Sequence, residues 1–249
     1  MGLGETMDAI SDIKRQWDSR VPHETDFYFF RNLTIQNPVV VDVGANAGQS
    51  VVSFMCTCNP GRVVSFEPNP RYAAALEHLK THLMTEGLFE YHLMGCGSSS
   101  GRLDLVIPYV DGEPYFQEAS LSVSHFEISW VKERLQSYGR ELSFQTLQIA
   151  IAPMDTFNLR PSVCKIDAEG WELDVLQGMA DTIQASPPIF LIENNDYTRV
   201  TAFLTERGYT AYEYRAASNS LVPLSQATTN TFYLRPQHFA WLSTSLGRN

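Results

Sequence analysis

The feature that most constrains the fold is a buried strand that runs directly into a glycine turn and then into a helix. Residues 38–43 form a continuous apolar run broken only by Asp42, which is typical of a strand covered on both faces. A D-x-G-x-x-x-G turn with Gly44 and Gly48 follows, and a helical pattern begins at 49. In open parallel sheets, ligands bind beyond the carboxyl ends of the strands. The segment therefore predicts an α/β domain with a ligand beside this turn.

The alternation of strand and helix continues along the chain. Further strands are predicted at 62–67, 88–94, 163–167, 188–193, 209–215 and 231–235, with helices at 70–86, 170–184 and 198–207. Strands separated by helices form right-handed crossovers and a parallel sheet. The last two strands have no helix between them, which predicts an antiparallel hairpin at the sheet edge. We expect a doubly wound, seven-stranded, mostly parallel sheet with one antiparallel edge strand.

Two segments add to this pattern within a single predicted domain, 1–249. Residues 1–37 precede the first strand, and the apolar stripe of a helix at 5–20 predicts a cap over the domain or a site mouth. Residues 101–155 interrupt the alternation before the fourth strand, with strands predicted at 102–108 and 142–152 and a helix at 125–138. An insertion of this size is often a substrate wall or a lid, and the alternative is an elaboration that only covers the sheet.

Charge and cysteine content narrow the class of partner. The chain has 18 basic and 28 acidic residues, a net charge of −10, and its lysines are scattered. No basic stripe is available to neutralise phosphates, so we expect neither nucleic acid nor an anionic membrane as a partner. No apolar run approaches the ~18 residues of a membrane span. The four cysteines lack metal-knuckle spacing and are predicted to be reduced, which favours a cytoplasmic location.

Four acidic residues end predicted strands: Asp42, Glu67, Asp167 and Glu193. Because the carboxyl ends of parallel strands share one sheet edge, we expect these acids to face a common crevice. An acid at Asp42 would repel the pyrophosphate of a dinucleotide and attract a cation, such as the ammonium or sulfonium of S-adenosylmethionine. Glu67 lies about 20 residues after the turn, where an acid can accept hydrogen bonds from ribose hydroxyls.

The sequence also resembles a known family. The segments VDVGANAGQS (41–50), FEPNP (66–70), KIDAEGWELDVLQG (165–178) and NTFYL (230–234) are similar to those of FkbM-type methyltransferases. Pro153-Met154 departs from the family pattern, which has Thr-Leu there. The resemblance implies a class I methyltransferase fold, which is Rossmann-like, with S-adenosylmethionine as methyl donor. It also implies O-methylation, commonly of a hydroxyl on a sugar or another small natural product.

The resemblance assigns roles by matching position. Gly44, Asn46 and Gly48 would line the methionine part of the donor, and Glu67 would hold its ribose. Gly95 and Cys96 would lie near the adenine. Asp167 would lie near the amino group of the donor and the reacting centre.

Methyl transfer to a hydroxyl calls for a general base, and the sequence offers four candidates: Asp167, Glu193, Asp196 and His125. Asp167 and Glu193 are favoured because strand ends hold them rigidly, and His125 could reach the site from the insertion, although a lone histidine is more often a surface or packing residue. Asp167, Glu193 and Asn194 also form an oxygen ligand set suited to Mg²⁺, which would orient the hydroxyl and lower its pKa.

Two other functions remain open: a non-catalytic S-adenosylmethionine-binding protein, and an NAD(P)-dependent oxidoreductase, against which the absence of G-x-G-x-x-G argues. The expected partner is a small-molecule hydroxyl acceptor, and a homodimer is a further expectation.

Overall fold

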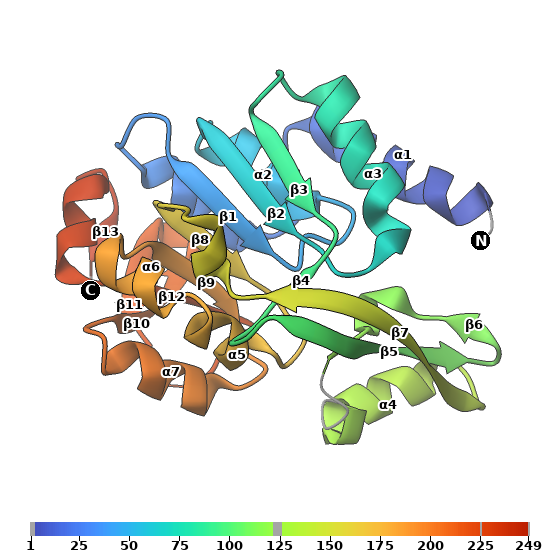
Figure 1. Cartoon of the computed structure of the whole chain (residues 1–249). Coiled ribbons are helices and arrows are strands. Elements are labelled where there is room, and N and C mark those ends of the chain that lie inside the picture. The colour runs from blue at the N-terminus through green and yellow to red at the C-terminus, as the bar shows by residue number, and fades with distance from the viewer. Residues whose placement is uncertain (1–2, 122–125, 225, 249) are drawn as a thin grey trace.

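One mixed sheet organises the chain (Figure 1). The computed structural model describes residues 3–121, 126–224 and 226–248. Within them the sheet has nine strands, in the order β3 (Phe89–His92), β2 (Arg62–Phe66), β1 (Val39–Val43), β8 (Val163–Ile166), β9 (Ile189–Glu193), β12 (Asn230–Leu234), β10 (Thr210–Arg215), β11 (Ser220–Pro223) and β13 (Gly247–Arg248). The five strands from β3 to β9 are parallel, as the alternation of strands and helices predicts.

The far end of the sheet differs from the prediction in two ways. The described sheet has nine strands rather than seven, and three of them, β12, β11 and β13, run against the five parallel strands where one was predicted. β12 pairs antiparallel with both β9 and β10, while β11 and β13 extend the sheet beyond β10. Phe232, Tyr233 and Leu234 on β12 are almost completely buried, so both faces of this strand are apolar. A strand of that kind favours an interior position, and the connection after β10 supplies the outer strand instead.

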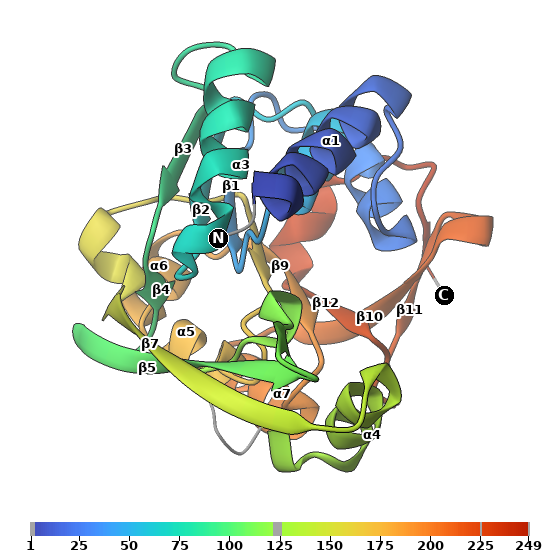
Figure 2. The ribbon, with the colours of Figure 1, turned by 90° about the vertical axis from the view of Figure 1, so that its right-hand side faces the viewer.

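Helices cover both faces of the sheet (Figures 1 and 2). On one face lie α1 (Leu3–Ser19), α2 (Gln49–Thr57) and α3 (Ala73–His78), and on the other α5 (Glu172–Gln177), α6 (Ala180–Ala185) and α7 (Tyr197–Thr205). Side chains alternate between the two cores: Val40 packs with the first set, and Val41 with the second. The doubly wound α/β architecture is therefore confirmed.

Two of the predicted helices are shorter than expected. The pattern at 70–86 gives a short 3-10 turn, α3 and a π-helical turn at Leu79–Leu83. The pattern at 170–184 divides into α5 and α6, which are separated by Gly178 and Met179.

The insertion builds a second sheet of its own. Its strands run in the order β4 (Gly95–Cys96), β7 (Leu142–Ala152), β5 (Gly101–Val110) and β6 (Glu113–Pro114). β5 and β7 pair antiparallel over their whole length, from Gly101 opposite Ile151 to Val110 opposite Leu142. The predicted strands at 102–108 and 142–152 are confirmed, and the predicted helix appears as α4 (Ser129–Tyr138). Because β4 directly follows the β3 segment, the second sheet is joined to the edge where the parallel strands end.

The N-terminal segment packs on the α2–α3 face. α1 contacts α2 and α3, and Ile13 is buried there. The 3-10 helix Thr25–Asn32 adds Phe27, Phe29 and Phe30 to the same core. None of the helices in the described ranges combines the length and apolarity that a membrane span needs.

The turn after β1 depends on Gly44. This residue has φ +81°, and a Cβ atom there would lie 1.7 Å from the backbone oxygen of Asp167. The β1 turn and the β8 loop therefore approach each other as closely as backbones can, which only glycine permits.

We expect Gly44→Ala to lower the free energy of unfolding by more than about 3 kcal/mol, because left-handed strain and a backbone clash add together. Gly87→Ala is the matched control: Gly87 has the same φ of +81° but no atom within 4 Å of the added Cβ. It should lose only about 1 kcal/mol. Urea unfolding of both variants measures the difference, and equal losses would contradict the role given to the close approach.

Candidate functional site

A cavity lies where the parallel strands end, beneath the insertion. Its walls come from four places: the turn after β1, with Gly44 and Asn46; the segment after β2, with Glu67 and Asn69; the β4 strand, with Gly95 and Cys96; and the loop after β8, with Asp167, Glu169 and Trp171. Leu105, Phe116 and Leu121 of the insertion close it. Six of the residues predicted to bind a cofactor are therefore brought together: Gly44, Asn46, Glu67, Gly95, Cys96 and Asp167.

Glu67 fastens two of these walls to each other. Its carboxylate is 6% exposed, and its Oε2 accepts a hydrogen bond from the backbone N–H of Asn46 at 2.7 Å. Its Oε1 accepts from the backbone N–H of Asn69 at 2.8 Å. Burial raises the pKa of Glu67 to about 7, although the two backbone N–H groups lower it. The carboxylate thus sets the spacing between the β1 turn and the segment after β2.

Two hydrogen-bond donors on the cavity wall lack an acceptor in the described part of the chain. They are Asn69 Nδ2 and Trp171 Nε1, and both atoms are buried. Buried polar groups of folded proteins are almost always paired, so unpaired donors in a cavity are typical of a binding site. Neither residue is evident as a site residue in the sequence, because nothing in the local pattern shows which side chains lose their partners.

Two residues predicted at the site lie outside the cavity wall. Gly48 begins α2 and packs against Leu79, so it shapes the helix start. Asp42 is completely buried within the sheet, where its Oδ2 accepts from Ser65 Oγ at 3.2 Å. The expectation that Asp42 faces the crevice is wrong, because its side chain points to the α2 face of β1, as that of Val40 does.

A buried polar row runs across three strands beneath the site. Ser65, Asp42 and Lys165 are register neighbours on β2, β1 and β8. Burial raises the pKa of Asp42 to about 6, against the charge of Lys165 and the Ser65 hydrogen bond, which lower it. Burial favours a neutral amine at Lys165, but the charges of Asp167 and Asp42 outweigh it and raise the pKa of this lysine. Lys165 therefore carries positive charge inside the protein.

Lys165 extends this row to the cavity. Its Nζ lies 2.9 Å from Asp167 Oδ2, and the side chains are 5% and 34% exposed. Burial raises the pKa of Asp167, but Lys165 and a hydrogen bond with Glu193 lower it below its ordinary value. Asp167 is therefore an ionised carboxylate with a fixed orientation.

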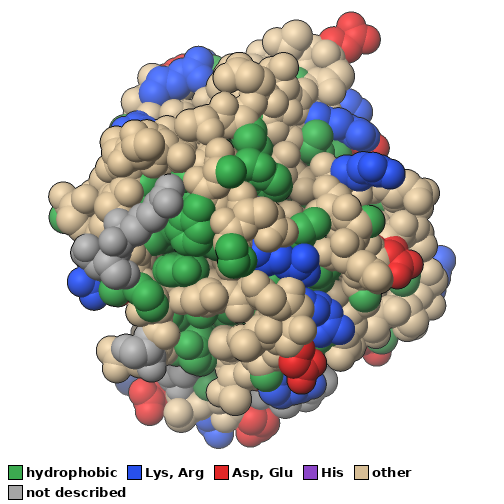
Figure 3. All heavy atoms as spheres, turned by 90° about the vertical axis from the view of Figure 1, so that its left-hand side faces the viewer, with side chains coloured by type: hydrophobic (Ala, Val, Ile, Leu, Met, Phe, Trp, Pro, Cys, Tyr) green, Lys and Arg blue, Asp and Glu red, His purple; other side chains and the backbone are tan. Residues whose placement is uncertain are grey.

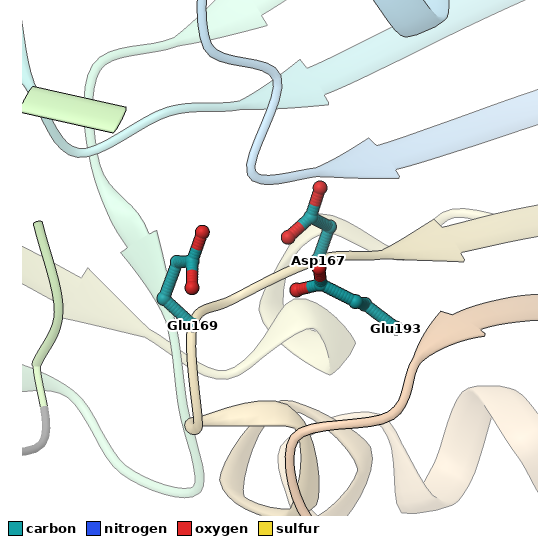
Figure 4. A group of neighbouring side chains, drawn as sticks. All are labelled: Asp167, Glu169 and Glu193. Atoms are coloured by element: carbon teal, nitrogen blue, oxygen red, sulfur yellow. The ribbon is translucent and has the colours of Figure 1, made fainter. Parts of the chain in front are cut away.

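Three carboxylates lie close together at the ends of β8 and β9 (Figure 4). One oxygen each of Asp167, Glu169 and Glu193 lies within 4.8 Å of the others. Burial and the charge of Asp167 raise the pKa of Glu193 to about 10 and that of Glu169 to about 8. Glu193 is thus protonated at neutral pH and hydrogen-bonded to Asp167, because carboxylates this close cannot all ionise.

Two of the three predicted magnesium ligands, Asp167 and Glu193, lie together with Glu169. The third, Asn194, donates from Nδ2 to Thr228 O and Thr231 Oγ1, and its Oδ1 is buried without a hydrogen-bond partner in the described residues. Lys165 donates to Asp167 Oδ2, and Asn195 donates from Nδ2 to Glu193 Oε2 at 2.7 Å. The magnesium site therefore stays a prediction.

His125, predicted as a base, lies outside the described residues. Another histidine, His23, has its Nδ1 2.7 Å from Ser53 Oγ. Burial and the charge of Lys165 lower the pKa of His23 to about 4, so its imidazole is neutral.

A model of the methyltransferase FkbM domain matches residues 42–211, which is more than half of the chain. No curated protein sequence matches the chain.

Among solved structures, the chain is similar to methyltransferase FkbM from Methylobacillus flagellatus KT, with 16% identity and a TM-score of 0.50. The match covers 84% of this chain and 50% of that one, so this chain spans about half the length of that protein. A precorrin-6y C5,15-methyltransferase from Geobacter metallireducens GS-15 is 13% identical, with a TM-score of 0.42 and coverage of 84% of each chain. These identities are low, and only the first likeness bears on the fold.

The family resemblance expected from the glycine turn, the FEPNP segment and the KIDAEG segment is confirmed by the domain match. The chain belongs to the FkbM methyltransferase family.

Proposed function

We propose that the protein is an S-adenosylmethionine-dependent O-methyltransferase that acts on a hydroxyl of a small molecule, such as a sugar or another natural product. The observation that carries the proposal is the cavity where Gly44, buried Glu67 and ionised Asp167 meet. An acidic residue in the ribose position and a close backbone approach at the glycine turn are both suited to an adenosyl ligand.

The residues on the cavity wall fit the donor. Gly44 and Asn46 would hold its methionine part, Glu67 its ribose, and Gly95 and Cys96 would lie near its adenine. The unpaired buried donors on the same wall support a polar ligand there. The donor supplies an electrophilic methyl group on a sulfonium, and its departure leaves a neutral thioether.

Asp167 is our candidate for the group that takes the proton of the acceptor hydroxyl. Lys165 and protonated Glu193 orient it, so its ionised oxygen is ready without rearrangement. A positioned general base contributes about 10²–10⁴-fold to a rate and is most effective when its pKa lies near the operating pH, so we expect the low pKa of Asp167 to keep its contribution near the lower end. Glu193, the other predicted base, holds a proton at neutral pH and serves better as a hydrogen-bond donor to Asp167.

A small-molecule acceptor agrees with the surface. On the face drawn in Figure 3, Lys and Arg side chains stand singly or in small groups among hydrophobic and uncharged side chains. Such a distribution, with a net charge of −10, does not favour a polyanionic partner.

Calorimetry with S-adenosylhomocysteine, S-adenosylmethionine and NAD(P) tests the proposal. We expect the wild-type protein to bind the first two and not NAD(P). Glu67→Ala should weaken S-adenosylhomocysteine binding by roughly 1–3 kcal/mol, because the ribose hydroxyls lose their acceptor. The unfolding temperature of each ligand-free protein is the control for loss of fold. Unchanged affinity in a folded variant would contradict the role of Glu67.

The raised pKa of Glu169 predicts that the stability of the folded protein depends on pH. The pKa of Glu169 is raised in the folded protein to about 8, so the folded state retains a proton that the unfolded chain releases near pH 4.5. The stabilisation is present at low pH and is lost as the pH rises from about 5 to about 8. The unfolding temperature of Glu169→Gln minus that of wild type should therefore increase as the pH rises through this interval. Glu206→Gln, at a side chain 77% exposed, should show a constant difference, and a constant difference for both would refute the assignment.

Because Lys165 and a proton on Glu193 already balance the carboxylates, we expect millimolar Mg²⁺ to shift the unfolding temperature by less than about 1 °C after EDTA dialysis. Thermal unfolding with and without S-adenosylhomocysteine measures this. A larger rise that Glu169→Gln abolishes would show that the three carboxylates bind the metal.

A further inference from the structure

Asn69 carries a buried hydrogen-bond donor with no partner within residues 3–121, 126–224 and 226–248. The residue is 3% exposed, it lines the cavity, and its Nδ2 contacts no acceptor. Burying a donor without an acceptor is unfavourable, so this group points to a ligand atom that completes the pair.

The orientation of the amide is fixed by a second contact. Asn69 precedes the short 3-10 turn Pro70–Tyr72, and its Oδ1 accepts a hydrogen bond from the backbone N–H of Arg71 at 3.1 Å. Turning the amide over would place its NH₂ group against that N–H, donor against donor. Nδ2 therefore stays the free end of the side chain.

Glu67 gives this donor a chemical context. The backbone N–H of Asn69 donates to Glu67 Oε1, so the two residues lie on one stretch of wall. Both carboxylate oxygens of Glu67 already act as acceptors, and each has a second lone pair that can accept a hydrogen bond from a ligand hydroxyl. A hydroxyl that donates a hydrogen bond to Glu67 still has lone pairs on its oxygen. These lone pairs lose their hydrogen bonds to water when the ligand is buried, so they need a donor from the protein.

We propose that Asn69 Nδ2 donates a hydrogen bond to the oxygen of a ribose hydroxyl, and that the same hydroxyl donates a hydrogen bond to Glu67. Together the two side chains recognise the hydroxyl as donor and as acceptor, which favours a ribosyl over a deoxyribosyl ligand. This inference rests on the proposed function, since it needs an adenosyl ligand in the cavity.

Asn69→Ser tests it, because serine keeps an oxygen that can cap Arg71 and lacks the amide nitrogen. We expect S-adenosylhomocysteine to bind this variant about 10-fold more weakly than wild type, with the ligand-free unfolding temperature unchanged within about 2 °C. The 2′-deoxy and 3′-deoxy analogues of S-adenosylhomocysteine identify the hydroxyl. One of them should bind wild type more than 10-fold more weakly than the parent ligand, because it loses its contacts with both Glu67 and Asn69. Asn69→Ser should not weaken the binding of that analogue further, because its hydrogen bond with Asn69 is already absent.

The inference is overturned if Asn69→Ser binds S-adenosylhomocysteine within about twofold of wild type, or if it loses the same factor for the parent and for both analogues. Should that variant fail to fold, Asn69→Asp keeps the shape and the cap and replaces the donor by an acceptor. Wild-type affinity in Asn69→Asp would also overturn the inference. Failure of the wild-type protein to bind S-adenosylhomocysteine is a separate result, which overturns the proposed function itself.

Discussion

The carboxylate of Glu67 holds together the two segments between which the cavity lies. Its oxygens accept from the backbone of Asn46 on one side and of Asn69 on the other. Both N–H groups belong to non-helical turns, where no regular backbone hydrogen bond is available to them. One buried side chain therefore defines the width of the cavity and also presents an acceptor to whatever binds there. The close approach of Gly44 to the Asp167 backbone sets the position of a further wall, the loop after β8.

Charge compensation explains how several acidic residues can lie together beside the loop after β8. The positive charge of Lys165 balances the negative charge of Asp167, and protonation removes the charge of Glu193. The group thus retains one ionised carboxylate with two supporting neighbours, which is a suitable arrangement for accepting a proton from a bound hydroxyl. The buried row of Ser65, Asp42 and Lys165 supports this arrangement from within the sheet.

The insertion changes the cavity from an open sheet edge into an enclosed space. Leu105, Phe116 and Leu121 line it together with Gly44 and Asn46 of the glycine turn. Ser120 of the insertion also donates to the backbone oxygen of Glu169, so the insertion fixes the loop that carries this carboxylate. Exclusion of water by such a roof strengthens the electrostatic interactions beneath it.

The sequence by itself determined the parallel core of the sheet, the glycine turn and the carboxylates at the strand ends, because these features depend on local periodicity and on residues close together in the chain. It also determined the family, through three short segments. Only the tertiary structure decided that β12 lies inside the sheet, that Asp42 points into the core, and that Glu169 joins Asp167 and Glu193. The partner of each side chain in these cases comes from a distant segment, and the ionisation of a carboxylate depends on how many charges and how little water surround it. Neither quantity can be read from neighbours along the chain.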